Sequence, residues 1–546
     1  MSMRNPSTYP SSDPIRLEVY KHLLSAIAEE MGAILRKASF SPNIKERRDY
    51  SCAIFDAQGN MIAQAAHIPV HLGSMPLSVK SAIAKFNTHG EHLFSGDTVI
   101  LNDPYLGGTH LPDITLVTPV FLNVSELSIS STNNALPIAF VASRAHHADI
   151  GGMTPGSMPI AREIFQEGLI IPPVKLVVAG NLNQDVLDII LSNVRTPEER
   201  AGDLKAQIGA NKRGADRLIE LFLRYGQDDV SRYMQELLSY TERMTRRLIS
   251  GLPNGKFSFS DTLDNNGITN SEIIIKVTIT INGATALVDF TGSAIQQESS
   301  VNAVYAITLS AVNYVFRSMI GLDVPNNSGC LLPVQIIAPK GTIVNASFPA
   351  PVAAGNVETS QRIVDVLLGA LAQACPDRVP AASQGTMNNV SIGGWDPERN
   401  QFFTYYETIG GGMGASSSEN GVSAIHSHMT NTLNTPIEAL EFAYPLQVNQ
   451  YSIRKQSGGK GIHNGGDGII REIKFLTDAQ VTVLTERRST SPYGLAGGES
   501  GKMGENRLTH NSKDIVLPGK GSFLVAKGDV LSIQTPGGGG FGKRDD

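Results

Sequence analysis

The sequence predicts an α+β protein, with a large mixed, β-rich, multi-layer fold and a helical insertion around residues 196–250. Glycine accounts for 53 of the 546 residues, which favours tight turns and strands over a helical bundle. Apolar residues alternate with polar ones from Ile273 to Ile281, as they do in a half-buried strand. The insertion is instead charged and amphipathic. We therefore expect an N-terminal α/β domain over residues 1–195, a helical segment over 196–252 and β-rich domains over 253–546.

The first element is predicted to be a helix that begins at Asp13-Pro14. A carboxylate at the N-cap followed by proline in the first turn is a typical helix start. Apolar residues then recur every four positions, and this spacing predicts one buried stripe on a core helix. The residues of this stripe are Ile15, Val19, Leu23, Ile27, Met31 and Leu35.

Strands follow in the rest of the N-terminal part. Residues 50–65 read as a β-hairpin around the turn Asp56-Ala57-Gln58-Gly59-Asn60. Apolar runs predict further strands over residues 98–101, 114–121 and 138–143. The histidine-bearing motifs described below therefore lie at strand ends or in connecting loops, where functional sites are commonly built.

The remaining elements are predicted from helix caps and turn signals. Thr196-Pro197-Glu198-Glu199 has the pattern of a capping box, and we expect two or three helices with a break near residues 225–228. Asn282-Gly283 between two alternating runs predicts a hairpin. Residues 303–320 and 360–376 are expected to be helical, and the last third is glycine-rich and β-like.

The composition excludes several classes of protein. The net charge is −6 and there is no basic block, so nucleic acid is not an expected partner. The 3 cysteines lack metal-type spacing, which argues against a disulfide scaffold and for a reducing compartment. No apolar run reaches about 18 residues, and the N-terminus lacks the apolar core of a signal peptide. We expect a cytoplasmic protein that does not enter a membrane.

The strongest candidate site is formed by two short motifs, His110-Leu111-Pro112-Asp113 and His146-His147-Ala148-Asp149. Imidazole and carboxylate groups together suit a divalent metal such as Zn, Mn or Fe. Pro112 disfavours a helix through Leu111, so a loop must bring His110 and Asp113 together. The alternative for this motif alone is a loop histidine hydrogen-bonded to a local carboxylate.

The second motif holds two adjacent histidines. Neighbouring strand residues point to opposite faces, so at most one of His146 and His147 should bind the same metal unless the strand ends there. We favour His146 as the ligand. His147 and Asp149 could then orient a ligand or touch the substrate.

Other candidate residues are less specific. Asp49, in the charged run Lys45–Tyr50, is either part of a solvated loop or a further carboxylate of the site, and spacing alone does not choose. His67 and His71 are four apart, but Pro69 between them argues against a helical metal pair, so we expect pocket-lining or structural roles. Further polar or glycine-rich candidates are the stretches 355–361, 405–414 with Glu407, and 426–432, which is expected to place His426 and His428 on one face of a strand.

The glycine-rich stretches do not form an ATP site of the P-loop type. They lack the Gly-Lys-Ser/Thr ending with which a P-loop holds phosphates. Tight turns and barrel corners would explain such glycines equally well.

Together the motifs resemble the hydantoinase B/oxoprolinase family. The resemblance covers almost the whole chain, from about Asp13 to the C-terminal glycines. The resemblance rests on the segments 46–51, 102–105, 107–113 and 146–152 and on the Pro-Gly-Gly-Gly-Gly tail. The family includes B subunits of ATP-dependent N-methylhydantoinases, oxoprolinases and caprolactamase, and subunits of acetone and acetophenone carboxylases.

The resemblance implies a metal-containing subunit of a hetero-oligomeric enzyme that opens a small cyclic amide. A hydantoinase A-type subunit would use ATP to phosphorylate the amide or carbonyl oxygen, and metal-activated water would attack the activated carbon. The implied metal ligands are Asp49, His110, Asp113 and His146, with His147 as a further candidate. Asp149 and Glu407 are the candidate catalytic carboxylates. The alternatives are a subunit of an ATP-dependent ketone carboxylase and a non-catalytic scaffold for the A subunit.

Overall fold

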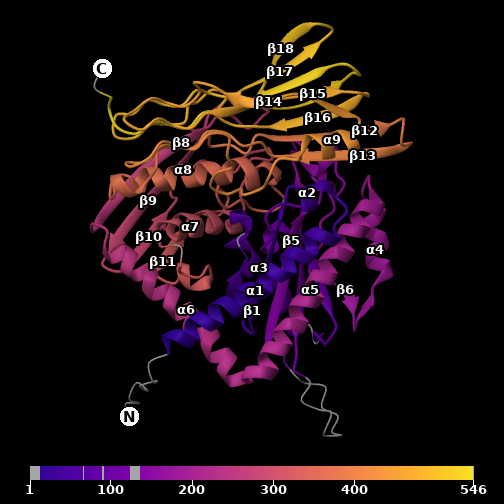
Figure 1. Cartoon of the computed structure of the whole chain (residues 1–546), viewed down its shortest axis with the longest axis vertical. Coiled ribbons are helices and arrows are strands. Elements are labelled where there is room, and N and C mark those ends of the chain that lie inside the picture. Colours follow the sequence, from indigo (N-terminus) through magenta and orange to yellow (C-terminus); the bar gives the residue numbers. More distant parts are fainter. Residues whose placement is uncertain (1–12, 66, 89–90, 123–135, 322, 545–546) are drawn as a thin grey trace.

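The computed structural model describes residues 13–65, 67–88, 91–122, 136–321 and 323–544. Helices and a central sheet from the N-terminal half form the lower body in Figure 1, and strands from the C-terminal third form the upper layers. This is the mixed, β-rich α+β architecture that the sequence predicts. In the part of the chain so described, no helix is long and apolar enough to span a membrane.

The N-terminal half is built on a seven-stranded antiparallel sheet with the order β2-β1-β5-β4-β3-β6-β7. Its strands are β1 (Tyr50–Asp56), β2 (Met61–Gln64), β3 (Thr98–Leu101), β4 (Asp113–Val120), β5 (Ala139–His146), β6 (Val174–Val178) and β7 (Asn181–Leu182). The hairpin and the three further strands expected here are therefore confirmed.

Helices cover both faces of this sheet. The helices before residue 226 are α1 (Pro14–Ala38), α2 (Pro42–Lys45), α3 (Ser74–Thr88), α4 (Gln184–Leu191) and α5 (Pro197–Tyr225). Successive residues of β1 point to opposite faces, so Ile54 packs with residues of α1 and α5 while Phe55 packs with residues of α3. The sheet is thereby buried on both sides.

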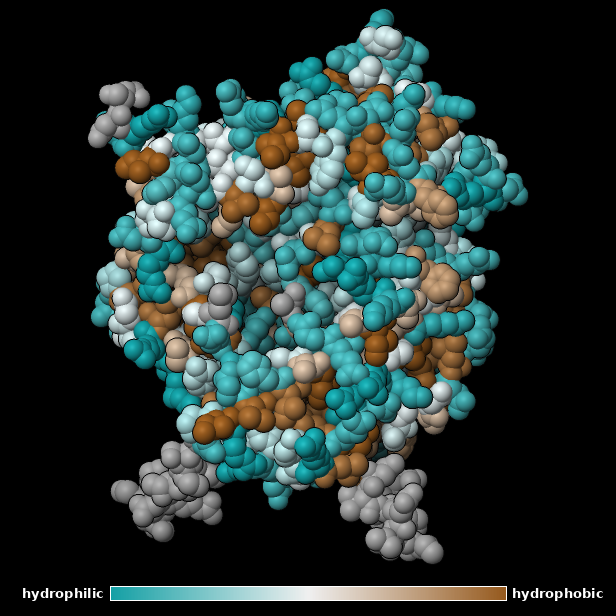
Figure 2. Space-filling view, in the orientation of Figure 1, coloured by the Kyte–Doolittle hydropathy of each residue, from teal (hydrophilic) through white to brown (hydrophobic). Residues whose placement is uncertain are grey.

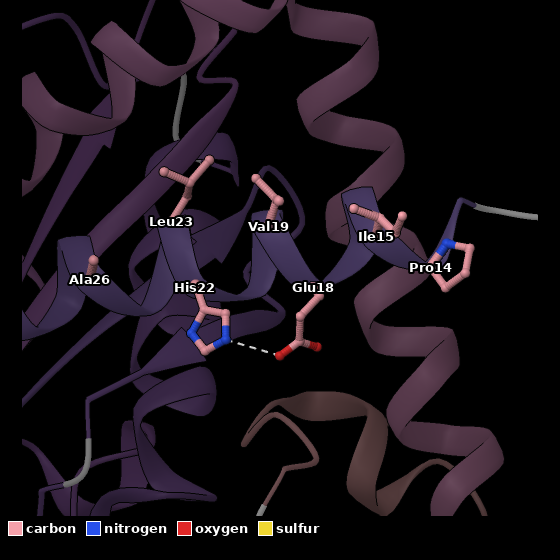
Figure 3. A pocket seen from close by; sticks show the side chains of 7 residues that line it. All are labelled: Pro14, Ile15, Glu18, Val19, His22, Leu23 and Ala26. Atoms are coloured by element: carbon pink, nitrogen blue, oxygen red, sulfur yellow. Dashed lines mark ion pairs between the residues drawn. The ribbon is translucent and has the colours of Figure 1, made fainter.

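Helix α1 begins as predicted, with the Asp13 carboxylate accepting the N–H of Ile15, but the prediction of one buried stripe is wrong. Ile15 and Val19 are 75% and 45% exposed, whereas Met31 and Leu35 are fully buried. Four residues advance about 40° beyond a full turn, so the stripe drifts around the helix by about 200° over its length. The exposed apolar half appears as a brown strip along α1 in Figure 2, and Figure 3 shows its side chains lining a shallow surface pocket.

The helical insertion consists of α5 and α6 (Gln227–Ser250), with a break at Gly226. Gly226 has φ +85°, a left-handed conformation that ends the first helix without strain only because glycine lacks a Cβ atom. The predicted capping box is wrong, since the Thr196 side chain makes no cap hydrogen bond at the start of α5. The predicted break and the predicted helices are confirmed.

The middle of the chain forms a four-stranded sheet, with the order β11-β10-β9-β8, that packs on helices. Its elements are β8 (Gly255–Leu263), β9 (Ile273–Asn282), β10 (Thr285–Asp289), β11 (Val334–Ile337), α7 (Tyr305–Met319) and α8 (Ser360–Leu371). The alternating residues of β9 are buried and exposed in turn, as predicted. The main hydrophobic core joins this sheet to residues from all three expected domains, and the domain limits themselves stay a prediction.

The C-terminal third is a sandwich of two sheets around one hydrophobic core. The sheets have the orders β13-β12-β16-β19 and β14-β15-β20-β17-β18. The elements are β12 (Asn389–Asp396), β13 (Gln401–Glu407), α9 (Ile437–Ala443), β14 (Leu446–Arg454), β15 (Gly468–Phe475), β16 (Ala479–Leu484), β17 (Glu505–His510), β18 (Lys513–Leu517), β19 (Lys520–Val525) and β20 (Val530–Gln534).

Glycines of the C-terminal third pack backbone against backbone. They come from the segments 410–421, 457–468, 494–501 and 537–542. A Cβ atom on Gly538 would lie 2.1 Å from the carbonyl oxygen of Met413. Gly538 also donates its N–H to Gly466 over 2.9 Å and accepts the N–H of Gly459 over 2.8 Å. The C-terminal glycine run is therefore a packed element of the fold, because side chains would push these backbones apart.

We expect Gly538→Ala to lower the free energy of unfolding by about 3 kcal/mol or more, because the added methyl group meets backbone atoms that cannot move aside. Gly209→Ala is the matched control. Gly209 lies on α5, and no heavy atom is within 4 Å of the Cβ atom that this substitution adds. Because alanine favours helix more than glycine does, the free energy of unfolding should rise by about 1 kcal/mol. Chemical denaturation measures both variants. Equal stability of the two would contradict the close packing of glycine backbones.

Candidate metal centre

The two histidine motifs meet at one end of the seven-stranded sheet. Asp113 is the first residue of β4 and His146 is the last residue of β5, and antiparallel pairing places them directly opposite each other. His110 lies in the loop before β4, where its carbonyl accepts the N–H of Asp113 over 3.1 Å. The strand register and this turn bring the three side chains together.

The donor atoms of these side chains converge on one point. His110 Nε2 lies 3.1 Å from Asp113 Oδ1, His146 Nδ1 lies 3.3 Å from the same oxygen, and the two nitrogens are 3.2 Å apart. In a tetrahedral site whose ligands lie about 2.0–2.1 Å from the ion, neighbouring ligand atoms are about 3.3 Å apart. The three distances observed here are close to that value. All three residues are buried. The group therefore fits a divalent metal in both chemistry and spacing.

Surrounding contacts fix the orientation of this group. The Nδ1 of His110 donates to the carbonyl of Ala353 over 3.2 Å, which leaves the lone pair on Nε2. The second oxygen of Asp113, Oδ2, accepts a hydrogen bond from the Thr109 hydroxyl and lies 3.4 Å from His71 Nε2. The first oxygen is thereby left to face the two imidazoles.

The electrostatics favour the cation-binding form of Asp113 and His146 but not of His110, where Asp113 and the Ala353 carbonyl outweigh the effect of burial and raise the pKa of the imidazole. Burial alone would raise the pKa of Asp113, but His110, His146 and His71 outweigh it and hold that pKa well below its usual range. Burial also lowers the pKa of His146, so its imidazole is neutral near pH 7. An ionised carboxylate and a neutral imidazole are the states in which these side chains act as ligands.

Asp49 lies beside this group and is buried, so the solvated-loop interpretation of its segment is wrong. It directly precedes β1, and its carbonyl accepts the N–H of His146 over 3.0 Å. Burial raises its pKa, although His146 and Arg47 oppose the shift. Its carboxylate lines the same cavity as Asp113 and His146 but is not one of the three converging groups.

The cavity at this site has a volume of about 20 Å³, room for about one water molecule or one ion. Its walls come from distant parts of the chain: Asp49, Ile68, Val70, His71, Asp113, His146, Asn356, Val357, Met387, Tyr406, Thr408, Met429 and Thr430. The ring of Tyr406 stacks on His146 with centroids 4.3 Å apart, and Arg47 covers the Tyr406 ring at 5.1 Å. His146 is therefore held flat against an aromatic wall.

His147 points away from the group. Its Nε2 lies 2.9 Å from the side-chain oxygen of Gln207 on α5, whose amide nitrogen donates to the carbonyl of Ile114. Burial and then the nearby Arg200 lower the pKa of His147 to about 4. Strand β5 ends at His146, so the separation of the two histidines rests on the contact of His147 with Gln207 and not on strand alternation.

The two candidate catalytic carboxylates also lie outside the group. Asp149 is buried and paired with Arg195, with Oδ1 2.9 Å from the guanidinium, and it accepts backbone N–H groups of the loop around Gly151. Glu407 forms a buried ion pair with Arg471, 3.2 Å apart. Both arrangements tie loops to the core of the protein.

The remaining histidine candidates fall into two groups. His71 lines the cavity and bridges Ser51 and Asp113, as the pocket-lining expectation predicted. His67 instead packs against Tyr50 and is structural. His426 and His428 lie in a loop, not on a strand.

Sequence reasoning did not single out Asn356 and Tyr406 individually. The Asn356 amide lies 3.0 Å from His110 Nε2 and comes from a single π-helical turn, Gly355–Thr359, before α8. The sequence signal for Asn356 was the run of polar residues at this helix start, because buried polar side chains need hydrogen-bond partners. Tyr406 lies on β13 of the C-terminal sandwich. Its place at the site depends on how the sandwich packs against the N-terminal sheet, which the sequence does not show.

Comparisons with known proteins agree with the expected family. A family model described as Hydantoinase B/oxoprolinase matches residues 13–544. An uncharacterized protein of Methanocaldococcus jannaschii is 44% identical over 97% of this chain and 91% of its own length. The 5-oxoprolinase of Dictyostelium discoideum is 41% identical over 98% of this chain but only 40% of its own length. The putative B subunit of a D-/L-hydantoinase from a Pseudomonas species is 34% identical, over 97% of this chain and 90% of its own length.

Two solved structures share the fold. The ATP-dependent caprolactamase from Pseudomonas jessenii superposes with a TM-score of 0.89 at 30% identity, covering 98% of this chain and 92% of that chain. A nucleotide-free acetone carboxylase gives the same TM-score of 0.89 at 18% identity, over 97% of this chain and 76% of that chain, and this likeness concerns the fold alone. The chain belongs to the hydantoinase B/oxoprolinase family.

Proposed function

We propose that this chain is the metal-containing B subunit of an ATP-dependent hydrolase that opens a hydantoin, an oxoproline or another lactam. The observation that carries the proposal is the convergence of three buried side chains, His110, Asp113 and His146, beside a small cavity that Asp113 and His146 line. The names of the relatives, 5-oxoprolinase, D-/L-hydantoinase and caprolactamase, support a cyclic amide as the substrate class.

His110 Nε2, Asp113 Oδ1 and His146 Nδ1 would hold the metal, and Asp49 is our candidate for a fourth ligand because its carboxylate lines the same cavity. A divalent metal there would supply a Lewis acid and lower the pKa of water. His71 lies against Oδ2 of Asp113, the oxygen that does not face the other two ligands, and so orients the carboxylate. The buried walls of the cavity exclude bulk water from the reacting carbon.

The comparisons support a division of labour with a second polypeptide. The chain spans about two-fifths of the length of the curated 5-oxoprolinases, but nearly all of the hydantoinase B-type relative and of the caprolactamase chain. We therefore propose that an A-type, ATP-using partner activates the amide oxygen, which makes the carbonyl carbon a better electrophile. The longer relatives contain further sequence beyond the part that matches this chain, and we propose that their ATP-using function lies in it.

Turnover is expected to require both polypeptides. The chain mixed with its A-type partner, ATP and 5-oxoproline, hydantoin or caprolactam should produce the ring-opened acid together with ADP, measured by chromatography. The chain alone with ATP and the same substrates should produce neither. Robust ATP-driven ring opening by the isolated chain would contradict the two-subunit proposal.

Asp113→Asn should reduce turnover of the assembled pair by at least about 100-fold, because it removes the charge that holds the metal between the two imidazoles. Assembly with the partner should persist, as measured by gel filtration. Assembly with unchanged turnover would instead mean that this chain is a non-catalytic scaffold.

Adjacent histidines provide a matched test of the metal centre. His146→Ala should lower the metal content of the purified chain by at least about tenfold, whereas His147→Ala should retain the metal, because only His146 faces the other ligands. Elemental analysis after gel filtration measures the content, and thermal melting confirms that both variants are folded. Loss of metal from His147→Ala alone would overturn the assignment.

A further inference from the structure

Asn356 places a buried amide directly beside the candidate metal ligands. It lines the same small cavity as Asp113 and His146, and it is 4% exposed. Its Nδ2 lies 3.0 Å from His110 Nε2. The three proposed ligand atoms are 3.1 to 3.3 Å from one another. The end of the Asn356 side chain is therefore as close to His110 Nε2 as the other ligand atoms are.

The amide nitrogen does not suit this position once an ion is bound. The hydrogen bond from Asn356 uses the Nε2 lone pair of His110, and a metal ion would take the same lone pair. An amide NH₂ group is a hydrogen-bond donor only, and its hydrogens carry partial positive charge. With an ion in the site, this end of the amide would lose its acceptor and face a cation.

The amide oxygen of Asn356 has no partner. This atom, Oδ1, is buried and accepts no hydrogen bond from the residues that the structure describes. Buried polar atoms are normally satisfied, so the oxygen indicates a bound species. Because the two ends of an amide have nearly the same shape, a half turn about the last side-chain bond would place Oδ1 where Nδ2 is now. The only hydrogen bond that this turn breaks within the described part of the chain is the one to His110, which the ion would replace.

The backbone around Asn356 is held in place. Oε1 of Glu167 accepts two successive backbone N–H groups, each over 2.9 Å, at the start of the helical segment that leads into α8. Gly355 packs so closely that a Cβ atom there would lie 1.7 Å from the carbonyl oxygen of Asn302. Single π-helical turns such as this one are frequent at functional sites. Adjustment to an ion therefore falls to the Asn356 side chain and not to its backbone.

We propose that Asn356 is a further ligand of the metal, which it binds through Oδ1 after its amide turns. The inference rests on the proposed function for the presence of the metal. It adds a neutral oxygen to the carboxylate and imidazole ligands, and carbonyl oxygen suits divalent cations such as Mn²⁺. The ion would then be bound both from the N-terminal sheet and from the turn before α8.

Two substitutions separate an oxygen ligand from a hydrogen-bond donor. Asn356→Leu removes both ends of the amide at similar volume, whereas Asn356→Asp keeps an oxygen but, when ionised, cannot donate. We expect the dissociation constant for Co²⁺ to rise at least about tenfold for Asn356→Leu and to stay at or below the wild-type value for Asn356→Asp. Visible absorption during titration of the metal-free full chain measures it. Equal weakening by both substitutions would show that Asn356 acts by donating a hydrogen bond, and would overturn the proposal.

Asn211 provides a matched control. It is also a buried asparagine with an unpaired Oδ1, but it lies on α5, away from the cavity walls. Asn211→Leu should leave the dissociation constant for Co²⁺ unchanged, and thermal melting shows whether each variant is folded. An effect as large as that of Asn356→Leu would mean that loss of any buried amide weakens the site, and would overturn the proposal.

A crystal structure of the wild-type chain loaded with Co²⁺ decides the case if Asn356→Leu does not fold. We expect a distance of about 2.0–2.2 Å between Oδ1 of Asn356 and the ion. An amide that is too far from the ion for coordination, or that still turns Nδ2 toward it, would overturn the proposal.

The titration also separates this inference from the proposed function. Absence of Co²⁺ binding by the wild-type chain would reject the metal centre, and with it both the proposed function and the role of Asn356. Tight binding that Asn356→Leu leaves unchanged would reject the role of Asn356 alone.

Discussion

The pairing of Asp113 with His146 at the ends of β4 and β5 is the constraint on which the candidate site depends. A slip of one residue in this register would turn one of the two side chains to the opposite face of the sheet. The register is fixed because the sheet is buried on both faces, by α1 and α5 on one side and by α3 on the other. The geometry of a few ligand atoms is thus set by the packing of a whole sheet.

Other parts of the chain complete the site from a distance. Ala353 and Asn356 reach His110 from the turn before α8, and Tyr406 reaches His146 from β13 of the sandwich. Burying a carboxylate without partners costs several kcal/mol. The partners of Asp113 are His110 and His146, which these contacts hold in place, together with His71 and Thr109. The N-terminal sheet, the turn before α8 and strand β13 all contribute side chains or backbone groups around the buried charge of Asp113. None of these segments could build the site alone.

The sequence predicted the elements and the core of the site well, because both depend on local patterns. The hairpin over 50–65, the alternating strand from Ile273 and the break near Gly226 follow from periodicity and turn residues. The motif residues His110, Asp113 and His146 were identified from their chemistry. The errors arose where position in space decides. The four-residue stripe of α1 drifts onto the surface, and the Thr196 side chain does not cap α5.

The cavity at the candidate site is too small for the proposed substrate. About 20 Å³ accommodates an ion or a water molecule, and a cyclic amide is several times larger. Substrate entry therefore requires a wall to move. Six of the lining residues lie outside helices and strands: Asp49, Ile68, Met387, Thr408, Met429 and Thr430. Met429 and Thr430 are neighbours in one irregular loop, which is tied to the N-terminal part by the hydrogen bond from Val70 N–H to the Met429 carbonyl, 3.2 Å long. A wall without regular strand or helix pairing opens at a lower cost than a packed strand does, so the entrance is expected among these six residues.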